Sequence, residues 1–188
     1  MSAVATYTLE AFVKDLQGDF AAHEDLVGRA NAVAETLEHL LKIGGWVQEL
    51  LDTGGYDALP GSTYQDTAYG HPDAGFHITC GAQIQGQANS PHDHGAGWVV
   101  YGTYEGAIEQ TRWQWDYSDG LLKPKLVKKE SFVQGPGQAA YFLPGEIHDT
   151  KNVAPDRSVV VRVESQNMST VWRHRYDKDK GTARAFLG

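Results

Sequence analysis

The stretch Gly86-Gln-Ala-Asn-Ser-Pro-His-Asp-His-Gly95 holds two histidines, His92 and His94, separated by one residue. On an extended chain, residues two apart project from the same face, so both imidazoles can reach one metal ion. A third histidine, His148, follows the corner Pro144-Gly145. Antiparallel pairing of the two segments would bring the third imidazole against the first two and fill one face of an octahedron. We therefore predict a metal site formed by His92, His94 and His148.

The overall composition is that of an ordinary globular protein. The chain has 188 residues, of which 41% are hydrophobic and 21% charged, and this predicts a single domain over residues 1–188. The formal charge of −8 disfavours nucleic acid as a partner, because binding to its backbone needs clustered Lys and Arg. The single cysteine, Cys80, excludes an intramolecular disulfide. No apolar run has membrane-spanning length and the N-terminus has no basic signal-peptide region, so we expect a cytoplasmic protein that contacts no membrane.

The N-terminal part of the chain has helical periodicity. Apolar residues recur at steps of three and four from Leu26 to Leu41, and this stripe ends at Gly44-Gly45. Shorter helices are expected over residues 9–16 and 46–51. We predict that residues 1–55 form a helical cover whose apolar faces pack on the core.

After Pro60-Gly61 the apolar period changes to two, which is typical of strands. In residues 74–84 the apolar side chains alternate with polar or small ones, and Cys80 lies on the apolar face, where a buried, inert thiol is favoured over a reactive one. Further strands are expected at residues 98–104, 108–117, 121–132, 139–143, 158–164 and 171–176, the last of them as an exterior strand. Short strands separated by Gly and Pro turns predict a mainly β sandwich or small barrel over residues 60–178.

Two spaced patterns in this region resemble the motifs of the cupin superfamily. Gly86, His92-x-His94 and Gly106 follow the first motif, and the stretch from Pro144 to Asn152, with its central histidine, follows the second. The resemblance implies a cupin jelly roll, that is, a double-stranded β-helix barrel.

The family's usual glutamate ligand is missing, since its position falls on Trp98 or Val99. Together with the helical N-terminus, this makes the chain similar to the cysteine dioxygenase group of thiol dioxygenases, and the resemblance implies mononuclear Fe(II) as cofactor. Zinc, nickel or manganese could occupy the same ligands. Three neutral imidazoles leave iron(II) its full charge, which favours an anionic chelating substrate such as a thiolate or an enolate. The expected partners are O2 and a small-molecule substrate, with the chain a monomer or homodimer.

The sequence departs from the cysteine dioxygenases in the residues around the metal. Those enzymes bind the substrate carboxylate with an arginine before the first motif, but residues 64–90 contain no Arg or Lys, and Asp66 stands at the matching place. No cysteine in residues 95–104 can form the family's thioether cross-link. Cysteine itself is therefore not the expected substrate. Three functions remain: oxidation of another thiol to a sulfinate, C–C cleavage of a diketone or hydroxyketone, or metal and ligand binding without turnover.

The family's late Ser-x-His-x-Tyr set is replaced here by Val160-x-Arg162-x-Glu164. If this face points inward, Arg162 can bind a substrate carboxylate or enolate oxygen, with Glu164 as its counter-charge, and both become candidate catalytic residues. The alternative is an outward-facing surface pair.

Several polar and aromatic residues have two possible roles. Asp93 either orients a neighbouring strand or meets solvent. Glu146 and Asp149 either fix the ring of His148 by a hydrogen bond or lie in a solvated loop, and Asn152 either serves the metal site or closes a turn. Four aromatic residues belong either to the core or to the wall of a substrate pocket: Trp98, Tyr101, Trp113 and Trp115.

Overall fold

The computed structural model describes residues 7–52, 66–70 and 75–188. Its N-terminal part consists of the helices α1 (Leu9–Ala22), α2 (Leu26–Ile43) and α3 (Gly45–Asp52). Asp25 caps α2, because its carboxylate accepts a hydrogen bond from the amide of Gly28 at 2.7 Å. The helix ends at Gly44, whose φ of 83° only glycine adopts readily.

The rest of the described chain forms antiparallel strands in three groups. A five-stranded sheet has the order β1 (Asp66–Gly70), β2 (His77–Gln83), β8 (Ser158–Glu164), β3 (Val99–Glu105) and β6 (Gln138–Phe142). A three-stranded sheet has the order β5 (Lys125–Gln134), β4 (Ile108–Asp116) and β7 (Ile147–Asn152). After the 3-10 helix η1 (Met168–Thr170), β9 (Trp172–Asp177) and β10 (Thr182–Leu187) form a separate two-stranded ribbon.

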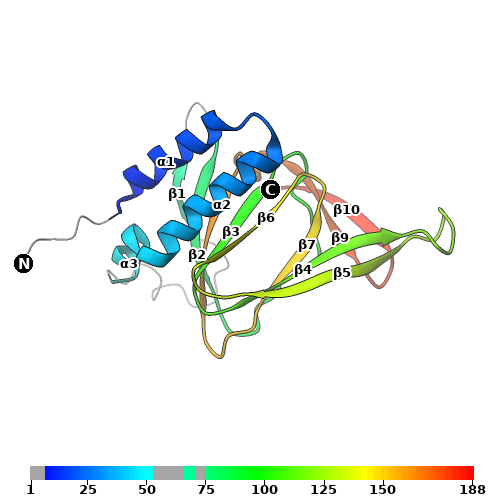
Figure 1. The fold of residues 1–188 in the computed structure, drawn as a ribbon. Coiled ribbons are helices and arrows are strands. Elements are labelled where there is room, and N and C mark those ends of the chain that lie inside the picture. The colour runs from blue at the N-terminus through cyan, green and yellow to red at the C-terminus, as the bar shows by residue number, and fades with distance from the viewer. Residues whose placement is uncertain (1–6, 53–65, 71–74) are drawn as a thin grey trace, which may run out of the picture.

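The five-stranded sheet separates two hydrophobic clusters. On its outer side, apolar residues of α1 and α2 pack on alternate residues of β2, β3 and β8, including Ile78, Val100 and Val161. The inner cluster lies inside the barrel and includes Tyr101 and Val160. Figure 1 shows α1 and α2 lying across the outer side of this sheet, with the β9–β10 ribbon at the opposite side of the molecule. The apolar face of β2, with the buried Cys80, is thus the face under the helices.

The predicted fold class, a mainly β jelly roll with an N-terminal helical segment, is confirmed. The sequence did not predict β1 or β10. The strand predicted over residues 74–84 is shorter in the structure, where β2 covers His77–Gln83, and residue 74 lies outside the described part of the chain. None of the described helices combines the length and apolar character needed to cross a membrane.

The contact between α2 and β3 requires a glycine. A Cβ atom at Gly102 would lie 2.7 Å from both Leu37 Cδ2 and Leu41 Cδ1, closer than real Cβ contacts allow. We expect Gly102→Ala to lower the free energy of unfolding by about 1–3 kcal/mol, because the buried side chains of Leu37 and Leu41, or the helix that carries them, must shift. Urea denaturation measures this change.

The control is Gly18→Ala in α1, where a Cβ atom would meet nothing within 4 Å. This substitution should raise the free energy of unfolding by about 0.5–1 kcal/mol, since alanine has the higher helix propensity. Equal effects of the two substitutions would contradict the direct packing of α2 on β3.

Candidate metal centre

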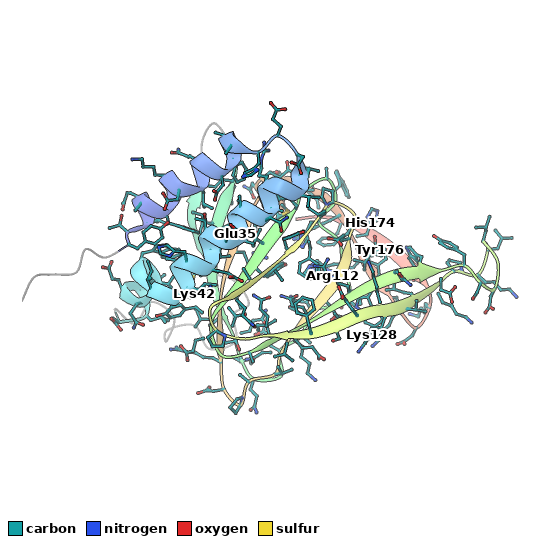
Figure 2. The ribbon with its side chains drawn as sticks, in the orientation of Figure 1. Glu35, Lys42, Arg112, Lys128, His174 and Tyr176 are labelled. Atoms are coloured by element: carbon teal, nitrogen blue, oxygen red, sulfur yellow. The ribbon has the colours of Figure 1, made fainter. Side chains whose placement is uncertain are left out.

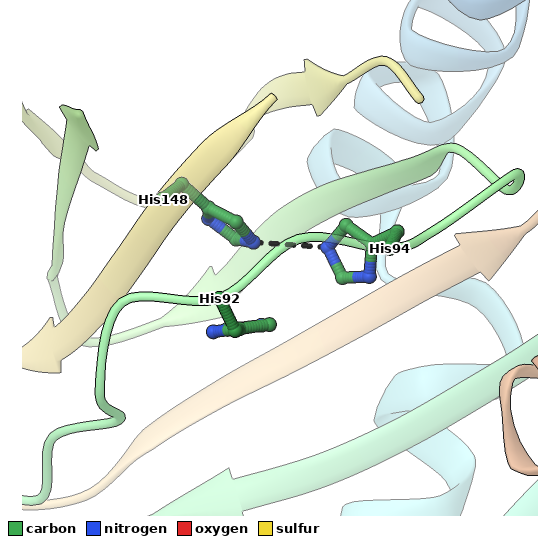
Figure 3. Close-up of side chains that lie close together, drawn as sticks. All are labelled: His92, His94 and His148. Atoms are coloured by element: carbon green, nitrogen blue, oxygen red, sulfur yellow. Dashed lines mark hydrogen bonds between the residues drawn. The ribbon is translucent and has the colours of Figure 1, made fainter. Parts of the chain in front are cut away.

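Three buried histidines converge inside the barrel. The Nε2 atoms of His94 and His148 are 2.9 Å apart, and one ligand nitrogen from each of His92, His94 and His148 lies within 4.8 Å of the others. In Figure 3 two of the rings come from the loop before β3 and the third from β7, and a dashed line joins His94 to His148. Among the described residues, no carboxylate or thiolate joins this cluster.

Backbone pairing brings these segments together. The amide of His92 donates to the carbonyl oxygen of His148, and the amide of His148 donates to the carbonyl oxygen of His92, each at 2.9 Å. The antiparallel pairing expected from the sequence is thus present, although the histidine loop contributes only an isolated bridge at this point rather than a regular strand.

Burial keeps the three rings uncharged. It is the main cause that lowers the pKa of His92 to about 4, and it holds the pKa values of His94 and His148 well below the usual range. Neutral imidazole is the form that binds metals. His92 Nδ1 lies 2.9 Å from the carbonyl oxygen of Ser90. Donation of its proton to Ser90 leaves the lone pair on Nε2, which is then the atom available to a metal ion.

The spacing of the donor atoms suits a metal ion. First-row divalent ions bind imidazole nitrogen at about 2.1 Å, so two ligands at right angles lie about 3.0 Å apart. The separation of 2.9 Å between His94 Nε2 and His148 Nε2 agrees with this value. Two neutral imidazoles at this distance share at most one hydrogen, whereas ligation uses both lone pairs. Three imidazole donors are a set that iron, zinc, nickel and manganese all accept, so the geometry does not select the metal.

Arg162 and Glu164 form the predicted pair, and the pair faces inward. A terminal nitrogen of Arg162 lies 2.8 Å from the Glu164 carboxylate, with the two side chains 14% and 5% exposed. Arg162 stands between Thr79 of β2 and Tyr101 of β3 in the sheet register. Its Nε donates to the Thr79 hydroxyl at 3.0 Å. These contacts hold the guanidinium in one orientation inside the barrel.

A cavity of about 480 Å³ adjoins the histidine cluster and has Arg162 and His92 in its wall. Arg173 and Arg175 of β9 also line it. The sequence predicted an exterior strand here, and β9 is one, since it lies in the separate ribbon and has no buried residue, but one of its faces also lines the cavity. The signal that was missed is the alternation Arg173-x-Arg175, which places two guanidinium groups on the same face of a strand.

Asp93 ties the β9–β10 ribbon to the histidine loop. Its side chain is buried, and one carboxylate oxygen accepts hydrogen bonds from the amides of Gly95 at 2.9 Å and His174 at 3.0 Å. The other oxygen accepts from the Tyr176 hydroxyl at 2.5 Å and lies 3.0 Å from His174 Nδ1. Figure 2 labels His174 and Tyr176 side by side at the ribbon. Burial raises the pKa of Asp93, but the hydrogen bonds from Tyr176, Gly95 and His174 outweigh it and hold the pKa below its usual value. Asp93 therefore orients a neighbouring strand.

The acidic residues beside His148 do not hold its ring. Glu146 accepts from Arg112 at 2.8 Å, and Asp149 accepts from Trp113 Nε1 at 2.8 Å. His148 Nδ1 has no hydrogen-bond partner within the described ranges. Stacking on Phe142 fixes the ring instead, with centroids 3.7 Å apart and planes at 23°.

The remaining candidates are structural, with one exception. Asn152 closes a turn, because its side chain donates to the carbonyl oxygens of Gln83 and Asp156, each at 2.8 Å. Trp98 belongs to the outer core. Tyr101 lines the cavity, whereas Trp113 and Trp115 are partly exposed on β4. Asp66 begins β1, and its side chain lies outside what the structure describes.

Comparison of the sequence with protein-family models and with curated proteins gave no match. Solved structures with a similar fold include an uncharacterized protein from Klebsiella pneumoniae with a double-stranded β-helix domain. It is 15% identical, with a TM-score of 0.45, over 69% of this chain and 82% of that one. An oxalate oxidase is 20% identical, with a TM-score of 0.40, over 49% of this chain and 42% of that one. KdgF from Halomonas sp. is 18% identical, with a TM-score of 0.41, over 56% of this chain and 90% of that one.

The hydrogen bond from Tyr176 to Asp93 should contribute measurably to stability. We expect Tyr176→Phe to lower the free energy of unfolding by about 1–3 kcal/mol, because it removes a donor from a buried carboxylate. Tyr117→Phe, at a tyrosine that is 48% exposed, is the control and should have little effect. Chemical denaturation followed by tryptophan fluorescence measures both. An unchanged unfolding midpoint for Tyr176→Phe would show that the Asp93 contact does not hold the ribbon.

Proposed function

We propose that this protein is a mononuclear metal-dependent dioxygenase that oxidises a small acidic thiol to a sulfinate. The observation that carries the proposal is the convergence of three neutral imidazoles, without an acidic ligand, beside a cavity whose wall holds Arg162. The net reaction joins one thiol and one O2 to give one sulfinic acid. Both oxygen atoms become bonded to sulfur, and the sulfur gives up the four electrons that reduce O2.

His92, His94 and His148 would hold the ion, which is iron(II) in this proposal. When bound on three neutral ligands, the ion keeps its double charge and supplies a site where an anionic chelating thiolate and O2 meet. The chain supplies the orientation. Ser90 fixes the tautomer of His92, and Phe142 fixes the plane of the His148 ring.

The position of Arg162 favours a thiol substrate that also carries a carboxylate. Its guanidinium is held by Thr79 and Glu164, so it meets the substrate as a fixed, preorganised fork. The segment before the first histidine contains no Arg or Lys, and this favoured a substrate without a carboxylate, such as a diketone. The inward orientation of Arg162 removes that reason, because β8 supplies the missing cation from another strand. Glu164 serves as the counter-charge and does not need to contact the substrate.

Metal content tests the ligand set. Protein purified with iron(II) should carry about one ion per chain, and His94→Ala or His148→Ala should lose it, because two imidazoles bind a divalent ion far more weakly than three. His39→Ala on α2 removes a histidine outside the cluster and should keep the ion. Elemental analysis gives the ratio. Equal metal content in all four proteins would contradict the site.

The role of Arg162 is tested with a pair of thiols. Arg162→Gln alone leaves the buried Glu164 unpaired, at a cost of about 3–5 kcal/mol, so the useful variant is Arg162→Gln with Glu164→Gln. This double variant should raise KM for 3-mercaptopropionate by about tenfold or more and change KM for cysteamine little, because only the first carries a carboxylate. Oxygen uptake together with sulfinate detection gives both values.

Equal changes for the two thiols would contradict carboxylate recognition by Arg162. If the wild type binds metal but consumes oxygen with neither thiol nor with diketones, the protein is a binding protein rather than an oxygenase. Two carbonyl fragments from a diketone would identify C–C cleavage as the reaction.

A further inference from the structure

The β9–β10 ribbon places two arginines directly opposite each other. In its register Arg175 pairs with Arg184, while Arg173 pairs with Phe186. Like charges at directly opposed positions of an antiparallel pair repel and destabilise the pair. An arrangement of this kind is expected where an anion lies between the two side chains in the working protein.

No acidic residue of the described chain forms an ion pair with either arginine. The nearest carboxylate along the strand, that of Asp177, accepts hydrogen bonds from the amides of Asp179 and Lys180 at 3.1 and 3.0 Å. It also lies 3.3 Å from the Lys180 ammonium group. Arg175 instead lies over the Phe186 ring, 4.5 Å from its centroid. Within the described ranges, neither Arg175 nor Arg184 forms an ion pair.

The arginine pair lines a second cavity of about 560 Å³, together with the basic side chains of Lys178 and Lys180 and one acidic residue, Asp177. Ser90 and Arg175 line both this cavity and the one that contains His92 and Arg162. The two cavities therefore adjoin at Arg175, and a molecule that spans this point has one end beside the histidines. The concentration of basic groups is notable in a chain whose formal charge is −8.

We propose that this second cavity, here called the ribbon cavity, binds an anionic group at the far end of the substrate. The group is a carboxylate or a phosphate ester held between the guanidinium groups of Arg175 and Arg184. This inference rests on the proposed function, since it assigns the reacting end of the same molecule to the histidine cluster. It makes the substrate a thiol with a distal negative charge, and it makes the ribbon the element that selects for that charge. Arg162 then serves the end of the molecule beside the metal, and Arg175 and Arg184 serve the other.

Binding of matched thiols tests the ribbon cavity. The probes are pantetheine and 4′-phosphopantetheine, which differ only by a distal phosphate, and 2-mercaptopentanoate and 2-mercaptoadipate, which differ only by a distal carboxylate. Isothermal titration calorimetry is carried out on metal-loaded wild type, on Arg184→Gln and on Arg157→Gln. Arg157 faces Glu105 at 3.6 Å and lines neither cavity, so its variant is a control with the same change in net charge.

In wild type and Arg157→Gln, at least one of the doubly charged thiols should bind about tenfold tighter than its partner, as expected for one charge-assisted contact. In Arg184→Gln this difference should disappear, while binding of the singly charged or neutral partner stays unchanged. Arg184 is exposed, so the variant should fold, and its thermal midpoint without ligand should be equal to or above that of wild type because the repulsion is relieved.

Two results would overturn the proposal. One is the absence of any preference for the added charge in wild type, and the other is a preference that Arg184→Gln retains. Inorganic phosphate is titrated in parallel. If it binds with the same dependence on Arg184 but neither thiol pair is distinguished, the cavity is a site for free anions and the substrate assignment is wrong. Metal content and sulfinate formation, measured on the same preparations, report separately on the dioxygenase proposal, and the titrations are repeated on metal-free protein to keep the two apart.

Discussion

The candidate site depends on one pair of backbone hydrogen bonds. His92 and His148 exchange amide and carbonyl contacts at 2.9 Å, and this bridge joins an irregular loop to β7, which is itself paired with β4. The bridge sets the separation of the two chain segments, so the rings that project from them meet in the barrel interior. Because that interior excludes water, the imidazoles remain neutral and available as donors. The chemistry of the centre thus follows from a contact that involves no side chain.

The central strand β8 serves both sides of the sheet. Val159, Val161 and Val163 belong to the cluster under the helices, while Arg162 and Glu164 point into the barrel. The helices and the candidate site therefore pack on opposite faces of the same strand. A polar pair can be buried on the inner face because its members balance each other and because Thr79 accepts a hydrogen bond from Nε of the guanidinium. The helix α2 packs closely on the outer side of the five-stranded sheet and so holds in place the sheet that carries this pair.

The C-terminal ribbon brings most of the positive charge to the site. It is attached through Asp93, which lies in the sequence between two of the histidines and accepts hydrogen bonds from His174 and Tyr176. A single buried carboxylate therefore couples the loop of the candidate metal centre to the strand that carries Arg173 and Arg175. In a chain of net charge −8, this local reversal of sign is a property of the site rather than of the whole surface.

The sequence by itself determined the fold class and the three histidines. Periodicity of three to four, then of two, separates helices from strands because each pattern reflects one local backbone geometry. The spacing His92-x-His94 and the corner before His148 are likewise local. Only the tertiary structure decided which way Arg162 points and which cavity Arg175 lines. Both faces of β8 carry apolar residues, so its sequence does not show which face lies inside the barrel. The alternation of residue types along a strand likewise does not show which of its faces packs against the rest of the protein. The tertiary structure also decided the role of Asp93, whose partners lie about eighty residues away along the chain. The physical reason is that these contacts depend on how strands distant in sequence pair with each other, and no local sequence pattern encodes that pairing.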